Sequence, residues 1–323
     1  MTMAFVFPVM TANSAINFSS NAQMLPQIKD LLHQFRLGTK KRLGQHFLTD
    51  GNVLQRILSA AELSSKDIVV EVGPGLGILT ERLAERVARV VAVELDSKLV
   101  RVLRKRLASF SNIEIVHADI LKIAPWQLLE DVIVRHEVPK QSLEPKLRAE
   151  GVAITQCYKV VANLPYYITS PILRHFLEAS LKPLLMVIMV QKEVGEAMAA
   201  NPGKMSLLSV RTQFYSKPTI VTHVPAGSFY PSPKVDSLVL RLDAYSKPPI
   251  EVSDIAGFFD IVTRGFSAPR KQLRNSLAQA LTMPPSQVVS LLEKSGIAAK
   301  RRAETLTLEE WEKLWNVFAS SRE

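Results

Sequence analysis

The sequence predicts an α/β fold: a doubly wound, mostly parallel sheet with an antiparallel pair at one edge, followed by a small all-α domain. Two observations support this prediction. Between residues 68 and 191, short apolar runs alternate with amphipathic stretches, a pattern typical of parallel strands joined by right-handed helical crossovers. Beyond residue 245 the strand-like runs stop, and amphipathic stretches with helical spacing take their place.

The predicted strands are short apolar runs. Five of them are separated by helical or mixed sequence: 68–72, 90–94, 113–119, 158–165 and 184–191. Two later runs, 217–225 and 236–243, leave no room for a helix between them, which favours an antiparallel pair that closes the edge of the sheet. Residues 124–157 are too long for a simple connection, and we interpret them as a helical insertion.

These patterns divide the chain into three segments. The sheet domain is predicted over residues 36–247, including the insertion, and the basic helical domain over 248–323. The first 28 residues carry no charge, so we expect residues 1–35 to be a flexible extension. A misassigned start, with Met24 as the true one, and a cleaved targeting peptide are the alternatives.

The net charge is strongly basic. The 323 residues include 40 Lys+Arg against 30 Asp+Glu, a formal charge of +10, which favours a polyanionic partner such as nucleic acid or an acidic membrane surface. The single cysteine, Cys157, excludes an intrachain disulfide and a cysteine-rich zinc module, and it fits a reducing cytoplasm. No apolar run reaches the ~20 residues that a membrane span needs, and the scattered histidines suggest no metal site.

A glycine-rich turn follows the first predicted strand. Gly73, Gly75 and Gly77 let the backbone approach a ligand closely and direct amide groups at it. Glu94 and Asp119 end the second and third strands at the same edge, where Glu94 suits a ribose diol. These features predict an adenosine-containing ligand, although a tight turn beside a surface acid would show the same pattern.

Two cofactors compete for this site. The dinucleotide fingerprint G-x-G-x-x-G fits poorly, because the third glycine comes one residue early and no basic group is placed for a pyrophosphate. Acids around the pocket suit S-adenosylmethionine, which carries a sulfonium cation and no phosphate. The pattern therefore favours S-adenosylmethionine over NAD.

The fourth strand ends in Asn163-Leu164-Pro165-Tyr166, the most specific signal in the chain. Exocyclic amines of nucleobases are poor nucleophiles because the nitrogen lone pair is delocalised into the ring. The Asn163 side-chain oxygen and the Leu164 carbonyl can accept both N–H groups and free that lone pair, while Pro165 fixes the turn. Tyr166 can stack on the base, and methyl transfer then needs mainly positioning. The alternative is a strand-ending Asn-x-Pro turn with a core tyrosine.

Six segments carry a resemblance to a known family: 40–48, 71–80, 94–96, 117–119, 163–169 and 229–237. They read KKRLGQHFL, EVGPGLGILT, ELD, HAD, NLPYYIT and FYPSPKVDS. In this order they resemble the motifs of the small-subunit rRNA adenine N6,N6-dimethyltransferases of the KsgA/RsmA type. Six ordered motifs are far more specific than any one of them.

The resemblance implies a Rossmann-like class I methyltransferase fold with S-adenosylmethionine as the methyl donor. The implied substrate is the pair of adjacent adenosines in the 3′-terminal hairpin loop of small-subunit (16S) rRNA, dimethylated at N6 by a monomer on the immature 30S-type subunit. Tyr166 and Phe229 would flank the target base, and His46 stands where many members have Asn. The residues implied at the donor are Gln45, His46, Leu48, Gly73, Gly75, Glu94, Asp119 and Asn163.

Basic residues form the expected RNA-binding surface. Between Arg264 and Arg302 only Glu293 opposes the basic side chains, and a second basic cluster precedes the GQHFL segment. A solvated basic face is the usual alternative explanation of such runs. The residues predicted to contact RNA are Lys40, Lys41, Arg42, Arg264, Arg270, Lys271, Arg274, Lys300, Arg301 and Arg302.

Three competing functions belong to other classes. A related methyltransferase of large-subunit rRNA, which confers antibiotic resistance, typically shows Ile in place of Leu164 and lacks the PSPKVDS context. A ribosome-assembly or transcription factor that keeps the fold would not need an intact Asn-Leu-Pro-Tyr segment. An NAD oxidoreductase would need a pyrophosphate site. Dimethylation rather than monomethylation follows from the resemblance alone, because no residue indicates that the pocket accepts a methylated amine.

Overall fold

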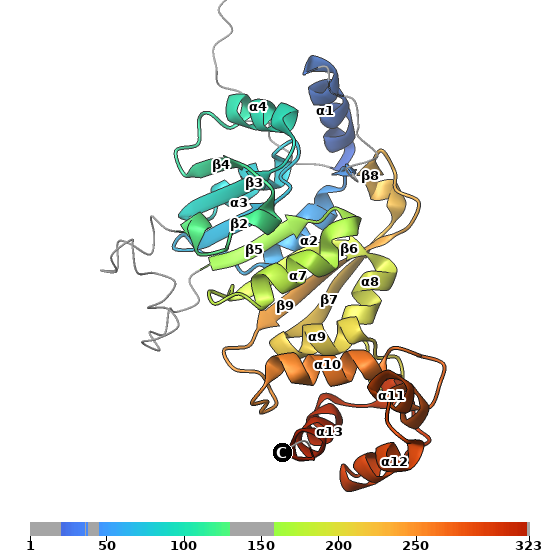
Figure 1. The fold of residues 1–323 in the computed structure, drawn as a ribbon. Helices are drawn as coiled ribbons and strands as arrows, with labels where there is room; N and C mark the ends of the chain where they lie inside the picture. Colours follow the sequence, from blue (N-terminus) through green and yellow to red (C-terminus); the bar gives the residue numbers. More distant parts are fainter. Residues whose placement is uncertain (1–20, 36, 38–44, 130–157, 322–323) are drawn as a thin grey trace, which may run out of the picture.

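A seven-stranded sheet forms the centre of the protein, in the order β4-β3-β2-β5-β6-β9-β7 (Figure 1). The computed structural model describes residues 21–35, 37, 45–129 and 158–321. The strands of this sheet are β2 Ile68–Val72, β3 Arg89–Glu94, β4 Ile113–His117, β5 Tyr158–Asn163, β6 Leu185–Gln191, β7 Ser216–Val224 and β9 Ser237–Ala244. The strands from β4 to β6 are parallel, and β9 runs antiparallel to both β6 and β7. The predicted fold class is confirmed, with the antiparallel pair at one edge.

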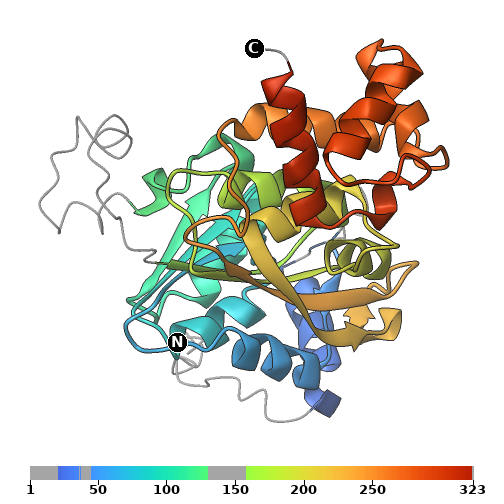
Figure 2. The ribbon, with the colours of Figure 1, turned by 90° about the horizontal axis from the view of Figure 1, so that it is seen from below.

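Helices cover both faces of this sheet (Figure 2). They include α2 Gly51–Ala60, α3 Ile78–Ala84, α4 Ser97–Arg106, α7 Thr169–Leu177, α8 Lys192–Met198 and α9 Leu207–Tyr215. Short 3₁₀ turns are η2 Ile120–Lys122, η3 Gln127–Leu129, η6 Tyr166–Ile168, η7 Ala226–Ser228 and η8 Ala303–Thr305. A separate two-stranded ladder pairs β1 Phe47–Leu48 with β8 Phe229–Tyr230.

Two hydrophobic layers follow from the alternation of side chains along each strand. Val69, Val90 and Val161 point to one face and share a core with α1 (Asn21–Gln34), α2, α3 and α4. Val70 and Ile188 point to the opposite face and share a core with α7, α9 and the C-terminal helices. Because both faces of β2, β3, β5 and β6 are covered, their sequences read as mostly apolar runs, whereas the edge strand β4 has no buried residue.

In the described chain, four helices follow residue 250, where helical sequence was predicted: α10 Ile255–Gly265, α11 Leu273–Leu281, α12 Pro285–Lys294 and α13 Leu308–Ser320. Their core is continuous with that of the sheet, because Phe214 of α9 stacks on Phe258 of α10 with 5.4 Å between ring centroids. Trp311 of α13 is fully buried, and a Cβ at Gly265 would lie 2.4 Å from its ring. These helices are therefore closely packed on one another and on α9, which covers the sheet.

The predicted insertion at residues 124–157 is described only at its beginning. There the turn η3 buries Leu128 and Leu129 in the core that also contains α7. The remainder, residues 130–157, lies outside the described residues.

The expectation of a flexible extension is wrong for residues 21–34, which form helix α1. Met24, Ile28 and Leu31 are at most 6% exposed, and they follow the i, i+4, i+7 spacing of an apolar helical stripe. Residues 25–27, which separate Met24 from Ile28, are uncharged, and the first charged residues, Lys29 and Asp30, lie in the second half of the helix. The absence of charge over the first 28 residues therefore does not mean an absence of amphipathicity. Residues 1–20 lie outside the described residues.

Ile28→Ala should lower the free energy of unfolding by about 2–5 kcal/mol, because it removes a fully buried side chain and leaves a cavity. Leu25→Ala, at a position 36% exposed on the same helix, is the matched control and should have a much smaller effect. Urea denaturation followed by circular dichroism measures both. Small and equal effects of the two substitutions would contradict the packing of α1.

Candidate active site

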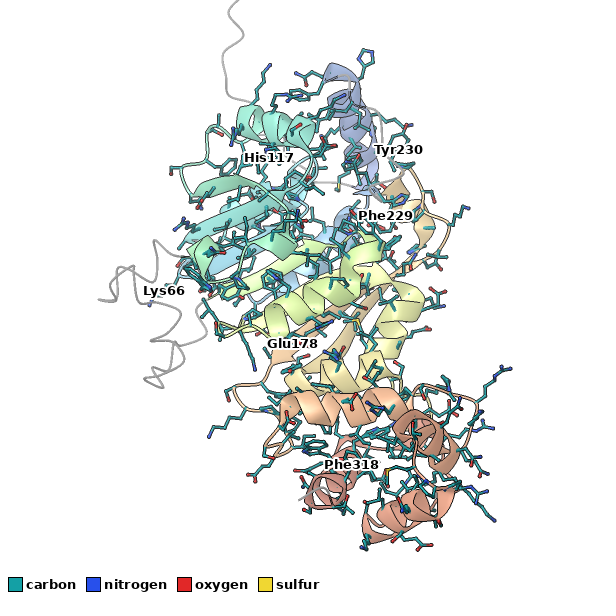
Figure 3. All side chains as sticks on the ribbon, in the orientation of Figure 1. Lys66, His117, Glu178, Phe229, Tyr230 and Phe318 are labelled. Carbon is teal, nitrogen blue, oxygen red and sulfur yellow. The ribbon has the colours of Figure 1, made fainter. Side chains whose placement is uncertain are left out.

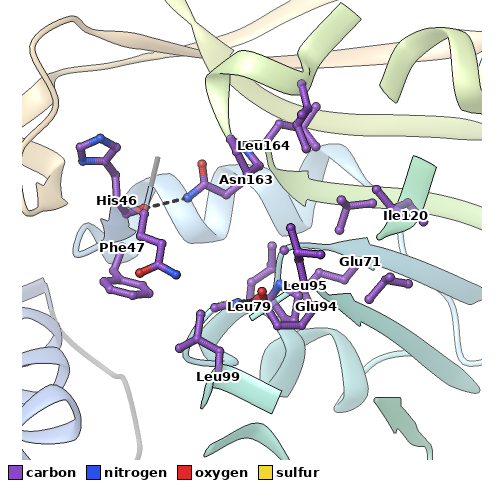
Figure 4. A pocket seen from close by; sticks show the side chains of 18 of the residues that line it. His46, Phe47, Glu71, Leu79, Glu94, Leu95, Leu99, Ile120, Asn163 and Leu164 are labelled. Atoms are coloured by element: carbon purple, nitrogen blue, oxygen red, sulfur yellow. Dashed lines mark hydrogen bonds between the residues drawn. The ribbon is translucent and has the colours of Figure 1, made fainter. Parts of the chain in front are cut away.

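A cavity of about 380 Å³ opens at the carboxyl ends of β2, β3, β4 and β5, with β1 along one side (Figure 4). Ligands of open α/β sheets bind at this edge. The predicted residues that line it together are Gln45, His46, Leu48, Gly73, Gly75, Glu94, Asp119, Asn163, Leu164, Pro165 and Tyr166. The fold therefore brings the predicted donor site and the predicted catalytic segment into one cavity.

The turn after β2 requires a glycine at position 75. Gly75 has a φ of +58°, in the left-handed region, and a Cβ there would lie 3.1 Å from Cε1 of Phe47. Its amide donates a hydrogen bond to Oε2 of Glu94 at 3.2 Å. Arg106 of α4 supports the turn from the other side, since its guanidinium donates to the Leu76 carbonyl at 2.5 Å. The turn is thus held in one conformation.

Two predicted acids reach the cavity from neighbouring strands. Glu94, at the end of β3, is 6% exposed and accepts hydrogen bonds from the backbone amides of Gly75 and Asp96. Burial raises the pKa of Glu94, and these backbone hydrogen bonds oppose that rise. Asp119, which follows β4, accepts from the Leu121 amide at 3.1 Å. A carboxylate has about four acceptor positions, so both groups retain capacity for a ligand.

A third acid, Glu71 on β2, was not among the predicted site residues. Its side chain lines the cavity and is 2% exposed, and its Oε2 atom has no hydrogen-bond partner among the described residues. Burial raises the pKa of Glu71 to about 8; the Thr80 hydroxyl opposes that rise and the Glu94 carboxyl adds to it. The sequence did contain a signal, because a charged residue within the buried run IVVEV is costly unless a partner or ligand compensates it.

The predicted catalytic segment begins with Asn163, the last residue of β5. Nδ2 of Asn163 donates a hydrogen bond to the His46 carbonyl at 3.1 Å, which fixes the plane of the amide (Figure 4). The Oδ1 atom of Asn163 has no partner among the described residues. Leu164 is buried, and its amide donates to the Met189 carbonyl of β6 at 3.1 Å. The backbone and side chain that carry the two predicted acceptors are therefore held in place.

Residues 228–237, the FYPSP-containing segment, support the catalytic residues. The Tyr166 hydroxyl lies 2.9 Å from Oγ of the buried Ser237, and Nδ1 of His46 lies 2.7 Å from the Pro231 carbonyl. The His46 and Tyr166 rings stack with 5.9 Å between their centroids. Ser237 and Pro231 belong to a recognisable motif, but their contacts join distant parts of the chain and leave no local pattern in the sequence.

Phe229 is not among the described residues that line the cavity. Its side chain is 4% exposed and belongs to the core shared with α1 and α2. It lies on β8, where it pairs with Leu48 of β1, beside Tyr230 (Figure 3). The structure therefore does not bring Phe229 next to Tyr166 at the cavity, and Phe229 supports the β1 wall from the core.

Several residues predicted to bind RNA make contacts within the protein. Arg264 pairs with Asp260 at 2.6 Å, and Arg301 pairs with Glu310. Arg274 is half-buried. The exposed members of the set are Arg270, Lys271, Lys300 and Arg302. Three others, Lys40, Lys41 and Arg42, lie outside the described residues.

None of the helices described here is both long enough and apolar enough to cross a bilayer. In the same parts of the chain, no group of three or more His, Cys, Asp or Glu side chains is arranged to hold a metal ion.

The sheet order, the glycine turn, the acids and the Asn-Leu-Pro-Tyr segment together define an S-adenosylmethionine-dependent methyltransferase. The family model described as ribosomal RNA adenine dimethylase matches residues 36–320. The chain therefore belongs to the ribosomal RNA adenine dimethylase family, which confirms the family that the motifs predicted. Its methyl donor is S-adenosylmethionine, and the NAD alternative is rejected.

Similar proteins agree with this family. Ribosomal RNA small subunit methyltransferase A of Dehalococcoides mccartyi is 42% identical over 312 residues, which cover 97% of this chain and 99% of that protein. The protein of the same name from Bacillus mycoides is 42% identical over 90% of this chain and 94% of its own. Among solved structures, the 23S rRNA methyltransferase ErmE is 28% identical with a TM-score of 0.62, over 84% of this chain and 99% of that one. A dimethyladenosine transferase from Plasmodium falciparum shares the fold at a TM-score of 0.67 and 24% identity, over 86% and 98% of the two chains.

Glu71 should make the stability depend on pH. A carboxyl whose pKa is raised on folding holds its proton more tightly in the folded chain. The free energy of unfolding should therefore fall as the pH rises from the ordinary pKa of 4.5 to about 8. Glu71→Gln removes this titration and should flatten the decline in Tm over that interval.

Differential scanning calorimetry at a series of pH values measures the decline. Glu293→Gln, at an exposed position on α12, is the matched control and should give the wild-type curve. Parallel curves for the wild type and Glu71→Gln would contradict a raised pKa at Glu71.

Proposed function

We propose that the enzyme transfers two methyl groups to the N6 amine of each of two adjacent adenosines in the 3′-terminal hairpin loop of small-subunit (16S) rRNA. The substrate is the immature 30S-type subunit during ribosome biogenesis, and the enzyme acts as a cytoplasmic monomer. The 42% identity to small-subunit methyltransferases, against 28% to the 23S enzyme, supports this choice of rRNA. The observation that carries the chemistry is the fixed amide of Asn163 in the wall of the cavity.

The acids of the cavity fit the donor. Glu71 has a buried oxygen without a hydrogen-bond partner in the described structure, and such an atom favours a cationic ligand group. When bound, S-adenosylmethionine supplies a methyl group on a positively charged sulfur. We assign Glu94 to its ribose, Asp119 to its adenine, and the turn containing Gly73 and Gly75 to its amino-acid end. The residues that border it on the β1 side are Gln45, His46 and Leu48.

Asn163 and Leu164 make the target amine nucleophilic. The lone pair of adenine N6 is delocalised into the ring, and it becomes available when the N–H groups donate to fixed acceptors. Oδ1 of Asn163 is one such acceptor, since Nδ2 is already held by the His46 carbonyl. The Leu164 carbonyl is the other, and Pro165 fixes the turn between them and Tyr166. With the donor bound, the bond from N6 to the methyl carbon would form as the methyl–sulfur bond breaks, and the donor would leave as a neutral thioether. The amine would lose a proton to solvent, and no covalent enzyme intermediate is needed.

Tyr166 provides the surface on which the target base stacks. The Tyr166 hydroxyl is held by Ser237, and the His46 ring already covers one face of the Tyr166 ring. The 5.9 Å between these ring centroids is less than the roughly 7 Å that a base inserted between two rings needs, since each contact requires at least 3.5 Å. We therefore assign the target adenine to the opposite face of Tyr166, with N6 toward Asn163.

Asn163→Ala removes an acceptor and the hydrogen bond to His46, and it should slow single-turnover methyl transfer by roughly 10²–10³-fold. The assay uses radiolabelled S-adenosylmethionine and unmodified small subunits, and it resolves mono- from dimethyladenosine. Asn201→Ala, at an exposed position outside the cavity lining, is the matched control. Donor affinity measured by calorimetry verifies that the variants are folded. Full activity of Asn163→Ala, or no dimethyladenosine from the wild-type enzyme, would overturn the proposal.

The C-terminal helices supply a second contact with RNA. We assign the phosphate contacts to the exposed basic residues, among them Arg270 and Lys300. Arg264 and Arg301 have a different role, because their guanidinium groups pair with Asp260 and Glu310. These pairs support the helices that present the exposed residues.

Arg270→Ala and Lys300→Ala should each weaken binding to small subunits and reduce the steepness of log K against log salt by about 0.7 per lost phosphate contact. Arg301→Ala should mainly lower Tm, because it removes the ion-pair partner of Glu310. Fluorescence anisotropy over a series of salt concentrations measures the slopes. An affinity that does not change with salt would contradict the electrostatic contribution.

A further inference from the structure

Exposed apolar side chains gather at the mouth of the cavity. Leu95, Leu121 and Tyr167 all line it, with exposed fractions of 52%, 37% and 58%. Tyr167 is the most exposed large hydrophobic side chain in the described chain. Apolar side chains that gather in this way mark an interaction surface. In the sequence, Leu95 and Leu121 come just after the acids assigned to the donor. Tyr167 comes directly after Tyr166, and so it lies on the side of the cavity assigned to the target base.

The backbone around Tyr167 is held, whereas no described residue stacks on its ring or bonds to its hydroxyl. The Ile168 amide donates to the Pro165 carbonyl at 3.1 Å, and the Thr169 hydroxyl donates to the Tyr166 carbonyl at 3.3 Å. Within the described residues, the Tyr167 ring makes no contact with another ring and its hydroxyl makes no hydrogen bond. A fixed backbone that presents a free aromatic ring at a cavity mouth suits a flat ligand.

Tyr166 and Tyr167 cannot hold the same base. A 3₁₀ turn has three residues, so successive side chains point about 120° apart. Tyr166 is turned inward to Ser237, while most of Tyr167 is exposed. An adenine that leaves a loop to enter a cavity also leaves its neighbours without their stacking partner. The flat group closest to a base on Tyr166 is therefore the next base of the same strand.

We propose that Tyr167 is a substrate-positioning residue that stacks on the nucleobase adjacent to the target adenosine. This inference rests on the proposed function, in which Tyr166 holds the target base. The ring replaces the stacking that the neighbour loses, and it fixes the RNA strand so that N6 of the target meets Asn163. Stacking on an aromatic ring tolerates any base, so Tyr167 can serve whichever of the two adenosines is being methylated.

Tyr167→Ala should raise KM for unmodified small subunits about tenfold and leave the donor Kd unchanged. Tyr167→Phe keeps the ring and should restore the wild-type KM. Ile220→Ala, at a position 40% exposed on β7, is the matched control for loss of an exposed apolar side chain. Methyl transfer at varied subunit concentration gives KM, and calorimetry gives the donor Kd. An unchanged KM, or a tenfold loss of donor affinity in its place, would overturn the inference.

A substrate with an abasic nucleotide beside the target separates stacking from a general loss of structure. Subunits with this nucleotide on either side, prepared by ligation of synthetic 3′-terminal RNA, should reveal which neighbour is used. On that substrate Tyr167→Ala should have the same KM as the wild type, because the stacking partner is already absent. If Tyr167→Ala raises KM by the same factor on the abasic substrate as on the normal one, the two losses are independent, and the assignment would be overturned.

Methylation of intact subunits by the wild-type enzyme distinguishes the two proposals. Its absence would overturn the proposed function and this inference with it. Normal methylation together with a wild-type KM for Tyr167→Ala would overturn the inference alone.

Discussion

The parallel register of β2, β3 and β5 is the constraint on which the active site depends. Val72 of β2 lies opposite Val93 of β3, so the residues that follow, Gly73 and Glu94, meet at one edge of the sheet. The alignment of β2 with β5 brings Asn163 to the same edge. A slip of one residue would turn these side chains to the other face and separate the acids from the amide. The apolar strands, buried on both faces, oppose such a slip.

The short strand β1 connects the Asn163–Tyr166 segment to the glycine turn at Gly75, two parts of the site that the sheet alone does not link. His46, next to it, accepts the hydrogen bond of Asn163 through its carbonyl and stacks on Tyr166 through its ring. Phe47 packs against the glycine turn at Gly75. Because β1 pairs with β8, residues 228–237 hold this whole arrangement from outside the sheet. The donor side and the substrate side of the cavity therefore share one support.

The central strands β2, β3, β5 and β6 could be predicted because buried parallel strands read as mostly apolar runs. Candidate site residues were predictable where they end a strand, as Glu94 and Asn163 do. Ser237 was not, because its role depends on a hydrogen bond to a residue far along the chain. Phe229 was expected at the base, but pairing with β1 turns it into the core. Helix α1 was missed because no charged residue marks the exposed side of its first half.

The stacked rings of Phe214 and Phe258 join α9 to α10 within one continuous core. The C-terminal helices therefore cannot swing freely against the sheet, and the separation between their exposed basic residues and Asn163 is a fixed length. An RNA docked on those helices would offer the cavity only the nucleotides that lie that length away. An enzyme whose RNA docks in this way would act as a molecular ruler, because it would select its target by position in a folded RNA.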